Sequence, residues 1–302
     1  MAFTPTNVNY AAEYSKALAN AYPYLSYFPE IWAGENSRLY KPGFGKTMYI
    51  PTLVTSGARA ADRDQITGTF NRNWNNALQA VTLEMDREWD TLVDPMDMEE
   101  TNDVATIANI TRTFNEQQKV PEMDAFLAAK LYSFTTPDTT APTAANFLEK
   151  WDAWLEAMTN ARVSLDRVVC YVSPATFSIL KSASGLSRFF TVNGAEGAGE
   201  PGHSINRLVA NMDGVRIRAV PADIMKSAFV FTEGWTPASG AKAINLIMVD
   251  VDAVAAPVKY ETSMISDPTA QSKGKYLYYE RYYYGAFKLN ERAGGIIVNA
   301  AS

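Results

Sequence analysis

The part of the sequence richest in groups able to do chemistry is DREWDTLVDPMDMEETNDV, residues 86–104. It contains eight carboxylates and one basic residue, Arg87. Clustered carboxylates could ligate a divalent cation or form an acid–base pair. A calcium loop is not favoured, because the segment that starts at Asp94 has no glycine at its sixth position, where such loops turn sharply. An acid–base pair is not favoured either, because no His, Lys or Tyr lies nearby in the sequence to separate the two pKa values.

The same acidic residues are well suited to start a helix. Asp94 can cap the first turn, Pro95 fits the first helical position, and Asp97 lies three residues after the cap. Glu99 and Glu100 fall in the first turns, where exposed backbone amides stabilise an anion by about 0.3–1 kcal/mol. We therefore interpret this stretch as a junction between a strand and a helix, and we expect no catalytic residue, metal ion or cofactor.

The other residues with reactive side chains are isolated. His203, the only histidine, has no acidic or thiol residue at a metal-ligand spacing, so we expect a solvated loop residue. Cys170, the only cysteine, lies in an apolar segment without a CxxC partner and is expected to be an inert core thiol. The segments GFGK (43–46) and GAEGAG (194–199) match neither phosphate-binding pattern, and we interpret both as turns.

Six tyrosines between residues 276 and 284 could form a stacking platform for bases or sugars. Arg281 is the only basic residue among them, which argues against binding of nucleic acid. Strand-forming aromatics with apolar neighbours more often belong to a sheet that is packed on both faces. We therefore expect a sheet strand covered on both sides.

Composition and charge exclude several classes of protein. The chain has 302 residues, 47% of them hydrophobic and 20% charged, which is typical of a soluble globular protein with two domains. The net charge of −6, without a run of Lys or Arg, argues against a protein that neutralises phosphates. A single cysteine excludes an intrachain disulfide and fits a reducing compartment. We see no secretion signal, and the longest apolar run, residues 244–249, is far shorter than the ~20 residues that span a bilayer.

The elements expected in the first half of the chain have surfaces that little of their own chain is expected to cover. Residues 1–45 are rich in Tyr, Pro and Asn, and we expect an arm that lies over other structure. Residues 46–57 and 77–89 alternate like strands and are joined by a polar loop of a length that is uncommon in compact domains. A helix with a narrow apolar stripe is expected from Pro95, and Pro121 should break or kink it before a second helix.

The second half reads as a compact domain. Residues 135–143, TTPDTTAPT, have the composition of a linker, and we place a domain boundary there. A helix follows over 147–158, then a strand over 167–173, and Ser173 and Pro174 supply the cap and first position of another helix. Further strands are expected at 215–220, 227–232, 243–249, 258–265, 276–289 and 294–299. The last three must pair elsewhere, for example with the segment before the linker.

Three parts of this chain cannot cover their own surfaces. They are the arm, the long two-stranded ribbon with its polar tip, and the helix with a thin apolar face. No enzyme constellation competes with this pattern. The sequence therefore favours a self-assembling structural protein.

In the order and spacing of its segments, the sequence resembles the major capsid proteins of tailed bacteriophages with the Hong Kong 97-type fold. The matching segments are KTMYIPTL, LEMDREWDTLVDPMDMEET with the helix after it, VPEMDAF, VVCYVSPATFSIL and YYYGAFKLNERAGGIIVN, which together span most of residues 40–302. The resemblance implies an α+β fold with these parts: an N-terminal arm (1–45), an extended β-hairpin loop (46–88), a peripheral domain with the long spine helix (89–140), an axial domain (141–250) and a return to the peripheral domain (251–302).

The resemblance also implies a function and partners. A protein of this family is a structural subunit, not an enzyme. It forms hexamers and pentamers of an icosahedral shell around double-stranded DNA, which it encloses without sequence-specific binding. The expected partners are further copies of the chain, a portal protein and, where needed, a scaffold or cement protein, and no membrane. The expected location is the virion, after assembly in the host cytoplasm.

Two features depart from some members of the family. No lysine occurs from residue 47 to residue 118, so the covalent crosslink that some members make through a loop lysine is not expected. The long cleavable scaffolding segment of other members is not recognisable, so we expect a separate scaffold if one is needed.

Candidate residues for contacts between subunits lie in the loop and at the helix start: Arg59, Arg63, Asp64, Arg72, Trp74, Asp94, Asp97 and Glu99. Two alternatives stay open. A bacterial nanocompartment shell protein would share the fold and differ in its cargo. A hydrolase would use the carboxylates of residues 86–104.

Overall fold

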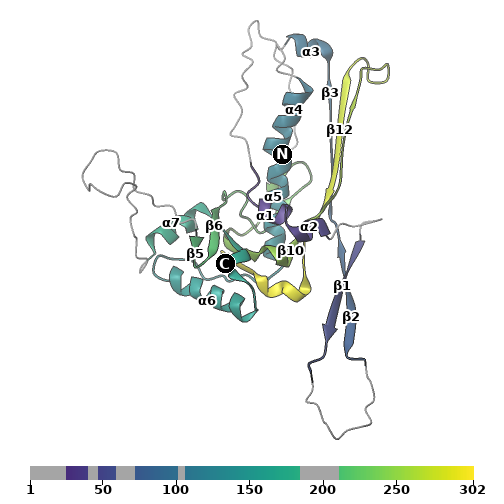
Figure 1. The fold of residues 1–302 in the computed structure, drawn as a ribbon. Helices are drawn as coiled ribbons and strands as arrows, with labels where there is room; N and C mark the ends of the chain where they lie inside the picture. The colour runs from purple at the N-terminus through teal and green to yellow at the C-terminus, as the bar shows by residue number, and fades with distance from the viewer. Residues whose placement is uncertain (1–24, 40–46, 59–71, 101–105, 184–210) are drawn as a thin grey trace, which may run out of the picture.

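The computed structural model describes residues 25–39, 47–58, 72–100, 106–183 and 211–302. Figure 1 shows a mixed α/β body, a long sheet and a helical rod that rise from it, and a two-stranded hairpin that projects the other way.

A five-stranded sheet forms the centre of the body. Its strand order is β14-β9-β4-β6-β5, with β4 and β6 parallel and the other neighbours antiparallel. The strands are β14 (Ile296–Ala300), β9 (Ile244–Asp250), β4 (Val168–Val172), β6 (Val215–Ala219) and β5 (Asn211–Met212). Every residue of β4 is buried, because helices cover both faces of the sheet.

The two faces of β4 bury different helices, because successive side chains of a strand point to opposite sides. Cys170 and its neighbours on one face pack on α6 (Phe147–Asn160) and α7 (Pro174–Ser182). Tyr171, on the other face, packs on α5 (Val120–Ser133) and α1 (Pro29–Trp32). The cap of α7 is as expected, since the Ser173 hydroxyl accepts the Thr176 N–H at 3.3 Å.

The long sheet joins strands from distant parts of the chain. Its order is β11-β12-β3, all antiparallel, with β11 (Val258–Ser266), β12 (Tyr276–Tyr284) and β3 (Met85–Val93). Two of the three tail strands, β11 and β12, thus join the segment before the linker as expected from the sequence, whereas the third, β14, pairs with β9 in the central sheet. Along one face of this sheet runs a helical rod made of α4 (Ile107–Phe114), a π-helical segment (Asn115–Lys119) and α5 (Figure 1).

The helices of this region differ from the expectation in two ways. The helix at Pro95 is short, α3 (Pro95–Glu100), and the rod has its own start, where the Thr106 hydroxyl accepts the Asn109 N–H at 3.4 Å. Before Pro121 the α-helix gives way to the π-helical segment and a second α-helix, α5, begins at Val120, so the expected interruption is present while the chain stays helical through it. Proline lacks an N–H and crowds the carbonyl four residues before it. A π-helical segment spaces its hydrogen bonds over five residues, and placed just before Pro121 it accommodates the ring.

The single strand expected over residues 77–89 is two strands. β2 (Trp74–Thr82) pairs with β1 (Thr47–Thr55), whereas β3 pairs with β12. Between them Leu83 is only 4% exposed, and its carbonyl accepts the Tyr283 hydroxyl at 3.0 Å. A Cβ on Gly285 would lie 2.8 Å from the Leu83 side chain, so only glycine lets the chains approach here. The predicted alternation was correct, but the strand changes partner at Leu83.

The described part of the N-terminal segment lies over the body. Phe28 and Ile31 are fully buried in the core between α5 and the central sheet. Asp124 of α5 accepts hydrogen bonds from the Ser26 hydroxyl (3.0 Å), the Tyr27 N–H (2.7 Å) and the Trp32 indole (3.1 Å). Residues 25–39, with α1 and α2 (Glu35–Leu39), therefore complete the fold of their own chain.

The remaining elements are short. They are β7 (Phe229–Val230), β8 (Thr236–Pro237), β10 (Val254–Ala255), β13 (Phe287–Lys288) and the 3-10 turns Leu165–Arg167, Val251–Ala253 and Asn290–Gly295.

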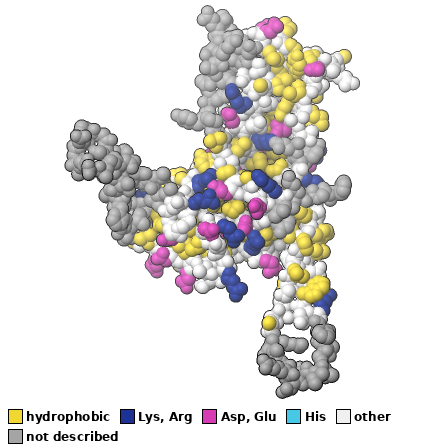
Figure 2. Space-filling view, viewed as in Figure 1, with side chains coloured by type: hydrophobic (Ala, Val, Ile, Leu, Met, Phe, Trp, Pro, Cys, Tyr) yellow, Lys and Arg dark blue, Asp and Glu magenta, His cyan; other side chains and the backbone are white. Residues whose placement is uncertain are grey.

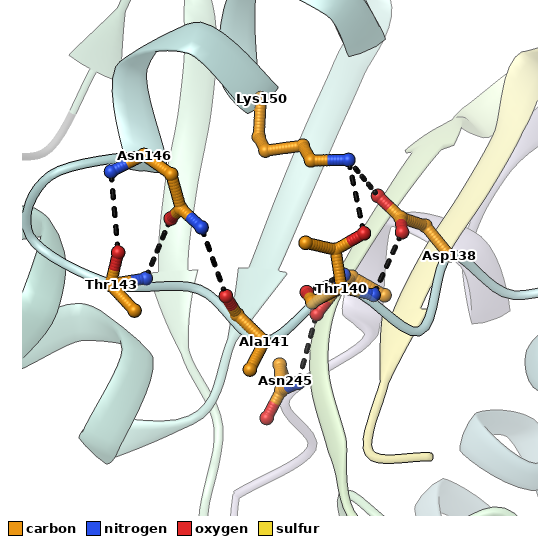
Figure 3. Close-up of polar contacts among 8 residues, drawn as sticks. Asp138, Thr140, Ala141, Thr143, Asn146, Lys150 and Asn245 are labelled. Atoms are coloured by element: carbon orange, nitrogen blue, oxygen red, sulfur yellow. Dashed lines mark hydrogen bonds and ion pairs between the residues drawn. The ribbon is translucent and has the colours of Figure 1, made fainter.

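The segment with the composition of a linker is pinned to the end of the chain (Figure 3). The Asp138 N–H donates to the Val298 carbonyl at 2.8 Å, and the Ala300 N–H donates to the Asp138 carbonyl at 3.0 Å. The Asp138 side chain accepts the Thr140 N–H at 2.9 Å and lies 3.4 Å from the Lys150 ammonium. Although desolvation opposes them, these contacts lower the pKa of Asp138 below its ordinary value. Asp138 thus fastens a strap along the free edge of β14.

Candidate assembly surfaces

The predicted contact residues lie at opposite ends of the long axis of the molecule. Arg72 and Trp74 are at the far end of the β1–β2 hairpin, and Asp94, Asp97 and Glu99 are at α3, beyond the other end of the long sheet (Figure 1). Arg59, Arg63 and Asp64 lie outside the described residues. One subunit therefore does not bring the two groups together.

One face of the hairpin is apolar and open to solvent. Antiparallel pairing places Tyr49 opposite Ala80, Pro51 opposite Leu78, Leu53 opposite Asn76 and Thr55 opposite Trp74, all on the same face. The large side chains on this face are exposed by 63% (Tyr49), 67% (Leu53), 62% (Leu78) and 51% (Trp74). Figure 2 shows such hydrophobic side chains reaching the surface along the hairpin. We call these four residues the hairpin face.

The opposite face of the hairpin fixes it to the body. Ile50 is 3% exposed and packs with Ala255, Phe287 and Leu289. Gln79 donates to the Lys288 carbonyl at 2.8 Å and accepts the Asn290 N–H at 3.1 Å. The hairpin is thus anchored at its base while the hairpin face is presented outward.

Arg72 is held by its own strand at the far end of the hairpin. Its Nε donates to the Trp74 carbonyl at 2.9 Å and a terminal nitrogen donates to the Asn75 side chain at 3.1 Å. The guanidinium lies 4.5 Å from the centre of the Trp74 ring, a favourable cation–π distance. Arg72 therefore adds a cation beside Trp74 at the end of the hairpin face.

The acidic residues at α3 start a helix, as expected. Asp94 Oδ1 accepts the Met96 N–H at 3.0 Å, and Lys275 Nζ lies 3.7 Å from Asp94 Oδ2. Asp97 falls in the first turn and Glu99 is exposed. Within the described ranges, no group of three or more His, Cys, Asp and Glu side chains could hold a metal ion.

The outer face of the long sheet changes character along its length. Near the body, Arg281 makes a two-pronged ion pair with Asp86 (2.9 and 2.7 Å), and the Tyr279 hydroxyl donates to Glu88 at 3.2 Å. Towards α3 the exposed side chains on this face become apolar, with Leu92 of β3 and Met264 of β11. The upper end of the sheet therefore carries a second apolar surface that the described residues of the subunit leave uncovered.

The inner face of the sheet is tied to the rod by buried charges. Arg87 of β3 donates to both carboxylate oxygens of Glu122 at 2.8 and 3.0 Å and to the Phe231 carbonyl at 2.5 Å. Burial raises the pKa of Glu122, opposed by the Arg87 guanidinium and the Tyr284 hydroxyl, which donates to it at 3.3 Å. Arg87 thus joins β3, α5 and the β7–β8 hairpin.

A second buried pair lies one turn along the rod. Lys119 pairs with Glu280 of β12, which also accepts the Tyr278 hydroxyl at 3.0 Å. Farther up, Trp89 stacks on Phe114 at 4.1 Å between ring centres. Sequence reasoning missed both ion pairs. The available signal was Arg87, which shares strand parity with the apolar Trp89 and so had to be buried with a partner.

The isolated reactive residues have the expected surroundings where the structure describes them. Cys170 is fully buried, and desolvation raises the pKa of its thiol, so it is inert. His203 and the segments 43–46 and 194–199 lie outside the described residues. The rod lies on the inner face of the tyrosine strand, and on the outer face Tyr283 is buried whereas Arg281 is exposed. Among the described residues, β12 is therefore covered on both faces at Tyr283 and Tyr284, and its outer face opens to solvent at Arg281.

Comparison with solved structures identifies the architecture. The chain aligns with the capsid structure of the cyanophage P-SCSP1u (TM-score 0.67, 13% identity, 97% of this chain and 93% of that chain). It aligns with the mature capsid of bacteriophage PhiM1 (TM-score 0.65, 14% identity, 97% and 92%). The chain has the fold of tailed-phage capsid proteins.

The same fold extends over nearly all of a third structure, the capsid of Ralstonia phage GP4 (TM-score 0.56, 14% identity, 99% of this chain and 98% of that chain). The α+β fold expected from the sequence is confirmed, and the arrangement is consistent with the Hong Kong 97-type fold. No family model matches the sequence, and no curated protein matches it. In the described parts of the chain, no helix is both long and apolar enough to cross a membrane.

Proposed function

We propose that the protein is a major capsid protein, a structural subunit that assembles with copies of itself into an icosahedral shell. The observation that carries this proposal is the hairpin face, an apolar surface on an anchored projection that the described part of the chain leaves open. Monomeric proteins rarely expose connected apolar surface of this kind. A fold shared along the whole chain with phage capsids supports a neighbouring copy as the cover.

The parts of the subunit take the following roles in this proposal. Residues 1–45 form the arm, 46–88 the extended loop, 89–140 the peripheral domain with the spine helix, 141–250 the axial domain, and 251–302 return to the peripheral domain. Arg72 and Trp74, together with Arg59, Arg63 and Asp64 of the same loop, are proposed to contact a neighbour. Asp94, Asp97 and Glu99 lie where the peripheral domain would do so.

The shell is proposed to consist of hexamers and pentamers that enclose double-stranded DNA in the virion, after assembly in the host cytoplasm. The net charge of −6 supports a container that does not grip its contents. A portal and, where needed, a scaffold or cement protein complete the proposed set of partners. Because no lysine occurs from residue 47 to residue 118, the contacts of the extended loop are proposed to be non-covalent.

Expression of the chain alone, followed by size separation and electron microscopy, tests this proposal. Closed shells or rings of five or six subunits are expected. A chain that stays monomeric with or without a co-expressed scaffold would contradict it. Nucleic acid recovered from nuclease-treated particles made in infected cells separates a capsid from a nanocompartment, which would contain an enzyme instead.

The same preparation tests the hydrolase alternative. Asp94→Asn and Asp97→Asn should weaken the start of α3 and change assembly, because Asp94 caps that helix. A hydrolase would instead lose turnover on ester or phosphoester substrates and assemble normally.

A further inference from the structure

Most sheet edges in the described part of the chain are protected against pairing with other strands. The free edge of β3 carries Asp86, Arg87, Glu88 and Asp90. β1 has Pro51 at its centre, which cannot donate a hydrogen bond. Charges and prolines are common means of protecting an edge.

The edges of the central sheet are protected differently. The free edge of β14 is covered by the strap that Asp138 fastens, and β5 at the other edge has only two residues. Since these edges are protected, a long edge strand without protection is an exception in this fold.

Two long edges lack such protection, and they belong to β2 and β11. β2, WNNALQAVT, has nine residues without a charge or a proline. β11 also has nine residues, and its outer half, Thr262–Ser266, is uncharged. Met264 and Ile265, on opposite faces of β11, are 57% and 63% exposed. In the described part of the chain each of these two strands pairs on one side only.

We propose that β2 of one copy pairs with the β11 edge of a second copy, which joins the hairpin and the long sheet into one five-stranded sheet between subunits. This inference rests on the proposed function. The two edges lie at opposite ends of the molecule, so a subunit cannot pair them itself (Figure 1). Strand addition to an exposed edge gains main-chain hydrogen bonds, and alternate side chains set its register.

A second copy fits these edges for reasons of charge and preorganisation. Both edges are neutral where they are exposed, so their pairing brings no like charges together. The turn between β11 and β12 is closed by a Gly274 N–H to Thr269 carbonyl bond of 2.9 Å, and the hairpin base is held by Gln79. Little ordering is therefore left to occur on pairing.

The kind of assembly that results also favours pairing of β2 with β11 over self-pairing of either strand. A self-pair is isologous and closes a dimer, whereas head-to-tail contacts between different surfaces generate rings. Rings of subunits are what the proposed function requires.

Disulfide formation between engineered cysteines tests the pairing. Met264→Cys is placed in one copy and, one position at a time, Asn75→Cys, Asn76→Cys, Ala77→Cys or Leu78→Cys in a second copy with a different tag. Paired strands place opposite Cα atoms ~4.5–5.5 Å apart, within the range for a disulfide. The native Cys170 is fully buried and does not interfere. Thr52→Cys on the protected strand β1 is the matched control.

The expected result is a tagged heterodimer in oxidised particles at every second position of β2, since alternate side chains share a face, and none with Thr52→Cys. A crosslink with Met264→Cys alone would show self-pairing of β11 and overturn the inference. Intact particles without any crosslink in the series would overturn it as well. Failure to form particles with the unsubstituted chain would instead contradict the proposed function, and this inference with it.

Discussion

The central sheet and the hairpin use the same kinds of residue with opposite results. In β4 every side chain is buried, because α6 and α7 cover one face and α5 and α1 cover the other. In the hairpin, Ile50 on one face is buried, whereas Leu53 and Leu78 on the other are more than 60% exposed. An apolar pattern therefore shows that a surface will be covered, and the rest of the chain decides whether the cover comes from the same molecule.

The difference predicts which substitutions unfold the subunit and which only prevent assembly. The expected effects on stability fall steadily from the core of the body to the hairpin face. All free energies below refer to the dissociated subunit.

The largest effect is expected in the core around the central sheet. Trp151 of α6 is 1% exposed, and its indole donates to Asp213 at 2.9 Å. Trp151→Ala should lower the free energy of unfolding by about 4 kcal/mol through lost burial and a cavity. Urea denaturation measures this, with Leu78→Ala as a control that should cost less than about 0.5 kcal/mol. Equal losses in the two variants would remove the distinction between body and hairpin.

The next effect concerns the ion pair that joins the long sheet to the rod. Glu122→Ala leaves Arg87 buried without its carboxylate and should cost about 3 kcal/mol. The double substitution Arg87→Met with Glu122→Met removes both charges and should cost less than the single change. A double variant less stable than Glu122→Ala in urea denaturation would contradict this role of the pair.

A smaller, pH-dependent effect is expected at the strap. The folded-state pKa of Asp138 is lowered, so its contribution is present above the unfolded-state pKa and is lost as pH falls through the folded-state value. The difference in stability between wild type and Asp138→Asn should therefore be largest near neutral pH and shrink below pH ~4. Denaturation midpoints measured across this range test the prediction. A difference that does not change with pH would contradict the role of the Asp138 carboxylate in fastening the strap.

The smallest effect on stability is expected at the hairpin face. Leu53→Ser with Leu78→Ser should change the free energy of unfolding by less than about 0.5 kcal/mol, since both side chains are already in water. The same variant should fail to form closed particles by electron microscopy. The matched control, Thr52→Ser with Ala77→Ser, changes the opposite face and should assemble. Normal particles from the first variant would show that the hairpin face has no neighbour.

Much of this fold follows from local patterns in the sequence. The alternation of Val81, Leu83 and Met85 and the cap at Ser173 each depend on neighbours along the chain, and both were predicted correctly. The change of strand partner at Leu83 was not, because it depends on Gly285 and Tyr283, which are distant in sequence. The π-helical segment before Pro121 was not predicted, and its Lys119 pairs with Glu280 of β12, which is distant in sequence.

The contact surfaces were predicted in part. Polar residues such as Arg72 and Asp94 were selected because charges stand out in a sequence. The exposed apolar residues Leu53, Leu78 and Met264 could not be distinguished from core residues, because exposure depends on which faces the folded chain leaves open. The linker composition of residues 135–143 likewise gave no sign of the bonds to β14, which require the distant C-terminal strand.

A cryo-electron microscopy map of the particle formed by this chain would test the central claim most directly. We predict that Tyr49, Leu53, Trp74 and Leu78 are buried against a neighbouring copy, with β2 beside that copy's β11. A closed shell in which the hairpin face remains open to solvent would contradict the assembly role assigned to it.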